Sequence, residues 1–225
     1  MSAQRPGATR LRTAAGRSAS SQRWLRRQLN DPYVLQARQQ GWRARSVFKL
    51  EEIDRRYGLL RRGHRVVDLG AAPGSWSQYA ARRGCRVVAI DLTPIVPITG
   101  VDRLEGDFLA PDVQTLLRER LGAPADVVLS DMAAPATGRR TLDRLRAEAL
   151  GECVLAFAEE TLAPGGACLI KLIKGGEAAL LPRARALFRP AGRIRPKAPR
   201  AESSEVYLRA QGRRELEPTA DQGQR

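Results

Sequence analysis

The sequence is poor in the residues that most metal and hydrolytic sites use. Its 225 residues include one histidine, His64, and three cysteines, Cys85, Cys153 and Cys168. The cysteines are odd in number and widely spaced, which excludes a disulfide framework and a Cys-x-x-Cys metal site and fits a reducing compartment. One histidine provides neither a zinc ligand cluster nor an ordinary Ser-His-Asp triad. The sequence therefore predicts no metal site, and we expect the three cysteines to be small buried residues.

Long apolar runs are also missing. No stretch of eighteen or more apolar residues occurs, and no apolar segment follows Met1, so the sequence predicts neither a membrane span nor a secretory signal. Hydrophobic residues still make up 43% of the chain, which is enough to build a core. The length fits one domain of ordinary size with short extensions.

Acidic residues are scarce in the first third of the chain. Residues 1–65 contain 16 basic and 4 acidic side chains, whereas residues 66–225 contain 23 basic and 20 acidic ones. The net charge of +15 is therefore concentrated near the N-terminus. A basic segment on a nearly neutral body predicts a polyanionic partner, a nucleic acid. The alternative is a solubilising basic tail.

Composition divides the chain into three parts. Residues 1–20 consist mainly of Ser, Ala, Gly and Arg and are predicted to form a disordered basic arm, although a targeting segment has a similar composition. Residues 21–212 form the predicted domain, and residues 213–225 a flexible tail. Within the domain, residues 21–62 are predicted to bind RNA, because arginine binds phosphate and aromatic rings stack on unpaired bases. The side chains concerned are Arg23, Arg26, Arg27, Arg38, Arg43 and Arg45, with Trp24, Tyr33 and Trp42. The alternative, which we weight equally, is that the aromatic rings anchor this segment to the core.

After Gly63, strand patterns alternate with helix patterns. Strands are expected at 65–69, 86–90, 104–108, 126–130 and 167–172, and near 192–195 and 204–209. Helices are expected at 47–57 (ended by Gly58), 75–83, 112–121, 139–162 and 177–188, with a turn at Gly165-Gly166. This alternation predicts an α/β fold with a parallel sheet and helices on both faces.

Polar residues follow the predicted strands, where ligands of such sheets bind. They are Asp68 with the turn from Gly70 to Gly74, and then Asp91, Asp107, Asp131 and Lys171. The turn lets the backbone approach a ligand at a helix N-terminus. Asp91 follows Gly70 by 21 residues, a position from which a carboxylate can accept both ribose hydroxyls, although strand-end turns also favour aspartate. Ala72 and Ser75 replace glycines of the dinucleotide fingerprint, so we expect a nucleoside-containing cofactor such as S-adenosylmethionine.

Lysine is rare, since only four of the 39 basic residues are lysines: Lys49, Lys171, Lys174 and Lys197. Lys171 lies within the apolar segment CLIKLI, in a protein that otherwise uses arginine for positive charge. A desolvated lysine can lose its proton, whereas arginine in practice cannot. Lys171 is thus a candidate general base, with a lysine extending from a strand end to solvent as an equal alternative.

Six segments together resemble a known family. They are VVDLGAAPGSWSQYA (66–80), SVFKL (46–50), GDF (106–108), LSDMA (129–133), LIKLIKGG (169–176) and SSEVYL (203–208). In this order and spacing they are similar to the FtsJ/RrmJ-type ribosomal RNA 2′-O-ribose methyltransferases, over about residues 21–210. Two departures are Ala134-Pro135, where many members have Pro-Asn, and Gly74-Ser75-Trp76, where many have Gly-Gly-Trp.

The resemblance implies a fold, a cofactor and a site. The fold is a Rossmann-like, seven-stranded, mostly parallel sheet whose last strand is antiparallel. The implied catalytic tetrad is Lys49, Asp131, Lys171 and Glu205, with Lys171 as the base. The implied S-adenosylmethionine contacts are Gly74, Trp76, Asp91, Asp107 and Asp131. Gly70 of the glycine turn is also predicted to contact the cofactor.

The resemblance also implies a substrate, a uridine ribose in large-subunit ribosomal RNA. The implied partner is this RNA within the large ribosomal subunit. A monomer in the bacterial cytoplasm is favoured, with a mitochondrial location as the alternative. Three other functions stay open: methylation of transfer or messenger RNA, a non-catalytic ribosome-assembly role, and an NAD-type oxidoreductase, which the missing fingerprint disfavours. The sequence leaves the modified nucleotide and the form of the RNA substrate undetermined.

Overall fold

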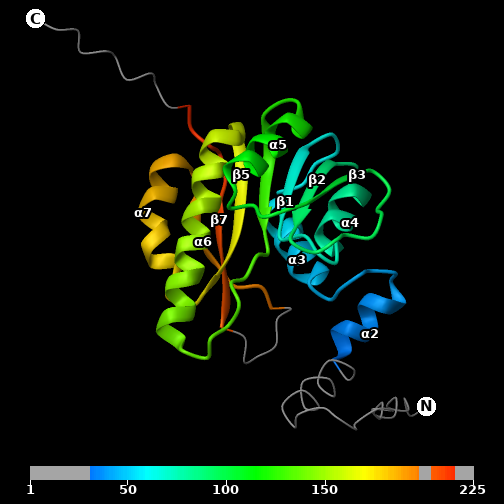
Figure 1. The fold of residues 1–225 in the computed structure, drawn as a ribbon, viewed down its shortest axis with the longest axis horizontal. Helices are drawn as coiled ribbons and strands as arrows, with labels where there is room; N and C mark the ends of the chain where they lie inside the picture. The colour runs from blue at the N-terminus through cyan, green and yellow to red at the C-terminus, as the bar shows by residue number, and fades with distance from the viewer. Residues whose placement is uncertain (1–30, 198–203, 216–225) are drawn as a thin grey trace, which may run out of the picture.

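Seven strands form one sheet in the computed structural model, which describes residues 31–197 and 204–215 (Figure 1). The first five strands run parallel and are β1 (Arg65–Leu69), β2 (Arg86–Asp91), β3 (Val101–Glu105), β4 (Ala125–Ser130) and β5 (Leu162–Ile173). The last two are β6 (Ala191–Ile194) and β7 (Glu205–Ala210). The strand order is β3-β2-β1-β4-β5-β7-β6, with β7 antiparallel to both neighbours. This confirms the predicted mostly parallel sheet with an antiparallel last strand.

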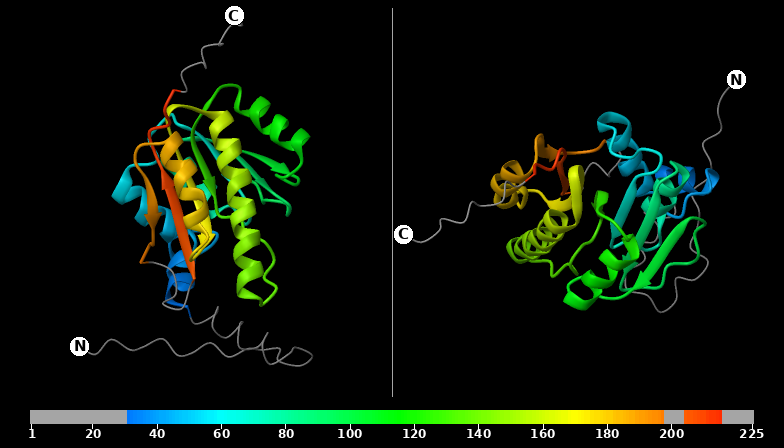
Figure 2. Two further views of the ribbon diagram at one scale, coloured as in Figure 1. Left: turned by 90° about the vertical axis from the view of Figure 1, so that its left-hand side faces the viewer. Right: turned by 90° about the horizontal axis from the view of Figure 1, so that it is seen from above.

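Helices cover both faces of the sheet (Figure 2). On one face lie α3 (Val47–Tyr57) and α4 (Ser75–Arg82), and on the other lie α5 (Pro111–Leu121), α6 (Arg140–Thr161) and α7 (Glu177–Leu187). Successive residues of β1 serve opposite cores, because Val66 packs with the α3–α4 layer and Val67 with the α5–α7 layer. Both valines are fully buried, as expected for a central parallel strand.

Three elements differ from the sequence prediction. Strand β3 spans Val101–Glu105, earlier than the expected 104–108. It is an edge strand with three charged residues, so its apolar pattern is weak. Strand β5 begins at Leu162 and includes the Gly165-Gly166 pair that was expected to form a separate turn. Helix α2 (Pro32–Gln39) was not predicted, although Asp31 caps it by accepting from the Tyr33 backbone N–H at 3.0 Å.

Two further observations concern the described residues only. No helix among residues 31–197 and 204–215 has the length and apolar character needed to cross a bilayer. In the same part of the chain, no group of three or more His, Cys, Asp and Glu side chains is placed to hold a metal ion.

A fully buried carboxyl group, that of Asp68, joins β1 to α4. Its Oδ2 accepts from the Ser77 hydroxyl at 2.6 Å, while its Oδ1 has no hydrogen-bond partner among the described residues. The pKa of Asp68 is raised from 3.8 to about 7, mainly by burial, with a smaller contribution from the charges of Asp131 and Asp91, while the hydrogen bond from Ser77 opposes the shift. The folded protein therefore holds a proton on Asp68 at pH values where the unfolded chain has released it.

This raised pKa predicts a loss of stability between pH 4 and pH 7. The burial of Asp68 is tolerated while the group is neutral, and the cost appears as pH rises toward the folded-state pKa, reaching on the order of 4 kcal/mol. In Asp68→Asn, which cannot ionise, we expect the free energy of unfolding to lose this component of its pH dependence. Denaturant titrations of both proteins from pH 5 to pH 8 measure the difference. Parallel curves would contradict the assignment.

Candidate active site

The predicted site residues meet where the parallel strands end, because their carboxyl ends share one edge of the sheet. A cavity of about 620 Å³ lies there, bounded by the turn after β1, the loops after β2, β3 and β4, and α6. Four residues predicted to bind the cofactor line it: Gly70, Asp91, Asp107 and Asp131. Its volume is in the range of small-molecule sites. Cys153 also lines it and is exposed, so the expectation of three buried cysteines was wrong for this residue.

The glycine turn has backbone angles that a residue with a Cβ adopts only with strain. Gly70 has a φ of +73°, and a Cβ there would come within 2.9 Å of the Met132 Cα. Gly74 has a φ of +100° and precedes the first residue of α4. The turn after β1 can therefore pack directly against the loop after β4, which carries Asp131.

Trp76 and Gly74 do not line the cavity. The Trp76 ring is 2% exposed, its indole N–H donates to the Ser46 carbonyl oxygen at 2.9 Å, and its centroid lies 6.0 Å from that of Tyr207. The side chain thus links α4 to the start of α3 and to β7. A contact of Trp76 with a ligand in the cavity would have to use its backbone.

Asp91 and Asp107 are held by local hydrogen bonds. Asp91 accepts from the Ala72 backbone N–H at 2.9 Å, and from the Thr93 backbone N–H and hydroxyl at 2.9 Å and 2.7 Å. Asp107 accepts from the Leu109 backbone N–H at 2.9 Å. Asp91 is thus both a turn residue, which was the alternative interpretation, and a cavity residue. These bonds fix each carboxylate while leaving oxygen lone pairs for a ligand.

Lys171 and Asp131 form an ion pair at the cavity. The Lys171 Nζ lies 3.1 Å from the Asp131 Oδ1 and also donates to the Asp131 main-chain carbonyl oxygen. The Asp131 backbone N–H donates to the Leu69 carbonyl oxygen at 3.2 Å, which holds this loop to β1. Neither side chain is more than 20% exposed, so their attraction is less screened than at the surface.

The other two predicted catalytic residues form a second ion pair. The Lys49 Nζ of α3 donates to the Glu205 Oε2 of β7 at 2.6 Å. In the antiparallel register Tyr207 lies opposite Lys171, and Glu205 lies two residues away on the same face of the sheet. The structure therefore brings all four residues of the predicted tetrad to one edge of the sheet, beneath α3.

Tyr207 is a site residue that sequence reasoning missed. Its ring is fully buried, and its hydroxyl donates to the Asp131 Oδ1 at 3.0 Å, the same oxygen that faces Lys171. Burial, followed by the charges of Asp131 and Glu205, raises its pKa well above 10. The hydroxyl thus stays a donor over the working pH range. The hydrogen bond joins residues 76 apart in sequence, so no local pattern indicated it.

Several side chains of the predicted RNA-binding segment contact other groups within the protein. The Arg43 guanidinium donates to the carbonyl oxygens of Pro73, Val96 and Pro97 at 2.6–3.1 Å, and Arg45 pairs with Asp31 at 3.0 Å. Two of the predicted aromatic rings also have partners within the protein, Tyr33 with Phe48 and Trp42 with Tyr79. For Tyr33 and Trp42 the structure thus shows the contacts expected of the anchoring alternative, and the two arginines also bind groups of the protein itself. Trp24, Arg23, Arg26 and Arg27 lie outside the described residues.

The sequence of this chain matches one protein family and several named proteins. Residues 42–213 match the model of the FtsJ-like methyltransferase family. A Gluconobacter oxydans protein named ribosomal RNA large subunit methyltransferase E is 48% identical over 90% of this chain and 76% of its own length. A protein of the same name from Acidiphilium cryptum is 49% identical over 94% of this chain and 95% of its own length.

A solved structure agrees with these sequence relatives. A Plasmodium falciparum protein described as a ribosomal RNA methyltransferase superposes with a TM-score of 0.70 at 26% identity, covering 76% of this chain and 98% of that one. The family match spans most of the chain and includes every residue of the predicted tetrad. The chain belongs to the FtsJ-like methyltransferase family.

Proposed function

We propose that this protein transfers a methyl group from S-adenosylmethionine to a ribose 2′-oxygen, of a uridine, in large-subunit ribosomal RNA of the bacterial cytoplasm. The observation that carries the proposal is the ion pair between Lys171 and Asp131, which lines the cavity, with the Lys49–Glu205 pair at the same edge of the sheet. Once deprotonated, a lysine in this position can accept a proton from a hydroxyl group, which is what methylation of a ribose requires.

The side chains around the cavity fit S-adenosylmethionine. Asp91 can accept from ribose hydroxyls, and the carboxylates of Asp107 and Asp131 favour a positively charged ligand. Phe108 and Met132 give the cavity apolar surface for a purine ring. When bound, S-adenosylmethionine supplies a methyl group on a cationic sulfonium, which is already activated for displacement.

The protein then has two tasks, alignment and proton removal. We assign Lys171 as the base, whose Nζ, once deprotonated, takes the 2′-hydroxyl proton as the oxygen forms its bond to the methyl carbon. Asp131 orients Lys171, since it pairs with the Nζ through one carboxylate oxygen and its main-chain carbonyl. We assign Lys49 and Glu205 to orientation of the ribose. The proton released in the reaction ends on Lys171 and passes to solvent.

The substrate proposal rests on the relatives, which are named for the large ribosomal subunit. Transfer or messenger RNA is the competing substrate within the methyltransferase class. A non-catalytic assembly factor is the competing function, and the assembled Lys-Asp-Lys-Glu arrangement disfavours it.

The first prediction concerns Lys171. In Lys171→Ala, kcat should fall by at least about 100-fold, because the proton acceptor is lost, while the Kd for S-adenosylmethionine should stay within a few fold. Lys171→Arg should be equally inactive, since arginine keeps the charge but cannot act as a base. Single-turnover methyl transfer and calorimetric cofactor binding measure the two effects.

A matched control for this prediction is Lys174→Ala, which removes an exposed lysine three residues along the chain. Its kcat at saturating RNA should be close to that of the unchanged protein. Near-normal turnover in Lys171→Ala would refute the assignment of the base.

A second prediction concerns Tyr207 as a positioning residue. Tyr207→Phe keeps the packed ring and removes only the hydroxyl that donates to Asp131. We expect kcat to fall by about tenfold, the value of one hydrogen bond to a charged group, with KM for RNA little changed.

The control is Tyr57→Phe, since the Tyr57 hydroxyl has no hydrogen bond among the described residues and its ring lies under Arg56 and Arg209. This variant should leave both kcat and KM for RNA unchanged. If Tyr207→Phe lost only stability, with kcat unchanged, Tyr207 would be structural rather than positioning.

A third prediction concerns the substrate. Labelled S-adenosylmethionine is offered with large ribosomal subunits lacking the modification, with deproteinised ribosomal RNA and with bulk transfer RNA, and the labelled nucleotide is mapped. We expect label on a ribose 2′-oxygen of large-subunit RNA. Label on transfer RNA would keep the chemistry and overturn the substrate, and absence of label with the cofactor bound would favour the assembly role.

A further inference from the structure

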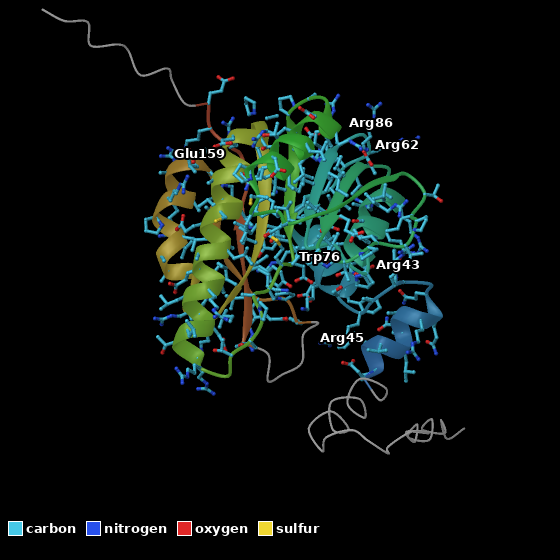
Figure 3. All side chains as sticks on the ribbon, viewed as in Figure 1. Arg43, Arg45, Arg62, Trp76, Arg86 and Glu159 are labelled. Carbon is cyan, nitrogen blue, oxygen red and sulfur yellow. The ribbon has the colours of Figure 1, made fainter. Side chains whose placement is uncertain are left out.

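The edge of the sheet opposite the cavity carries a separate group of basic residues. The loop before β1 and the loop before β2 touch there, with the Gly63 backbone N–H donating to the Gly84 carbonyl oxygen at 2.9 Å. The Arg86 backbone N–H donates to the His64 carbonyl oxygen at 2.8 Å. Figure 3 shows Arg62 and Arg86 together at this end, away from Arg43, Arg45 and Trp76.

Four arginines in these loops or directly after them form what we call the amino-edge cluster: Arg61, Arg62, Arg65 and Arg86. Three of them are exposed and Arg65 is half-buried. None of their guanidinium groups has a hydrogen bond or ion pair within residues 31–197 and 204–215. Arg65 and Arg86 are register partners on neighbouring parallel strands, so two unpaired cations lie side by side. Such an arrangement costs free energy unless a counter-charge is present.

The nearby acidic groups already have partners. Asp54 pairs with Arg83 at 3.4 Å, and Asp102 pairs with Arg120 at 3.2 Å. The Asp126 carboxylate accepts from the Arg65 backbone N–H at 2.7 Å. Apart from Asp126, whose carboxylate lies at the Arg65 backbone rather than at its guanidinium group, these acidic groups therefore do not offset the charge of the amino-edge cluster.

The surface beside the cluster is concave. A hollow of about 600 Å³ lies between the starts of β1 and β2 and the end of α5, and both Arg65 and Arg86 line it with Arg120. Guanidinium groups form paired hydrogen bonds with phosphate oxygens, so side-by-side arginines at a hollow suit a phosphate backbone better than a flat apolar partner.

We propose that the amino-edge cluster is a second contact surface for RNA, which holds backbone phosphates of the same substrate whose ribose enters the cavity. The inference rests on the proposed function. Strands β1 and β2 have five and six residues, so the two sheet edges are separated by roughly 20 Å. A folded RNA can reach both edges at once. A single strand advances by about 3.4 Å per stacked nucleotide, so a fragment of about three nucleotides bound at the cavity is too short to reach the cluster.

The test compares two double variants that remove the same charge. Arg62→Ala/Arg86→Ala removes half of the amino-edge cluster. Arg185→Ala/Arg189→Ala removes two exposed arginines on or just after α7, whose guanidinium groups have no partner within the described residues. Kd is measured over a series of salt concentrations for folded large-subunit RNA and for a short oligonucleotide that carries the methylated position. Methyl transfer to the oligonucleotide is measured in parallel.

For folded RNA, we expect the cluster variant to bind about tenfold more weakly at moderate salt, and its log Kd–log salt slope to fall by about 1.5, since two phosphate contacts are lost. Its Kd and turnover with the oligonucleotide should equal those of the control variant. Equal affinities and slopes of both variants for folded RNA would overturn the proposal.

Two other results would also overturn the proposal. A measurement on the unchanged protein distinguishes failure of this proposal from failure of the proposed function. An equal loss of affinity for the oligonucleotide would mean that the cluster acts through general charge rather than as a distant surface. A loss of binding to an acidic protein, with RNA binding intact, would assign the surface to a protein partner. Failure of the unchanged protein to methylate any RNA would refute the proposed function, whereas the binding series would still decide the role of the cluster.

Discussion

The position of one carboxylate, that of Asp131, limits the arrangement of the whole site. Asp131 follows β4. Its backbone N–H donates a hydrogen bond to β1, and its side chain contacts both Lys171 and Tyr207. The three contacts come from the strands on either side and from the antiparallel strand β7. A shift in any of them would weaken the contact between the lysine and its partner, because hydrogen bonds have a narrow range of distance and angle.

The two edges of the sheet have opposite electrostatic character. Carboxylates gather where the parallel strands end, and each is fixed by backbone or side-chain donors. Unpaired arginines gather where the same strands begin. The carboxyl edge suits a small cationic ligand, and the amino edge suits a polyanion. In the proposed arrangement the small cationic ligand is bound at the carboxyl edge alone, whereas the RNA presents a ribose there and backbone phosphates at the amino edge.

Sequence reasoning located the parallel strands and the residues at their ends well, because parallel strands must end at one edge. The rarity of lysine singled out Lys171, whereas Lys49 and Glu205 were indicated only by the resemblance to a family. Contacts across long stretches of sequence were missed. Tyr207 is an apolar-strand residue by pattern, and only the register of β7 against β5 brings its hydroxyl to the site. Likewise, arginines near the N-terminus have the same composition signature whether they bind RNA or, as Arg43 does, backbone carbonyls.

The place of β7 in the sheet has a consequence for how the protein comes into being. This strand follows both of its neighbours in sequence, yet it lies between β5 and β6 and supplies Glu205 and Tyr207. During synthesis, β5 and β6 emerge first and must leave a gap that only the later residues of β7 can fill. A nascent chain whose β7 has not yet emerged therefore lacks two residues of the site. The site is complete only once β7 has been synthesised, so a chain truncated before Glu205 should be inactive.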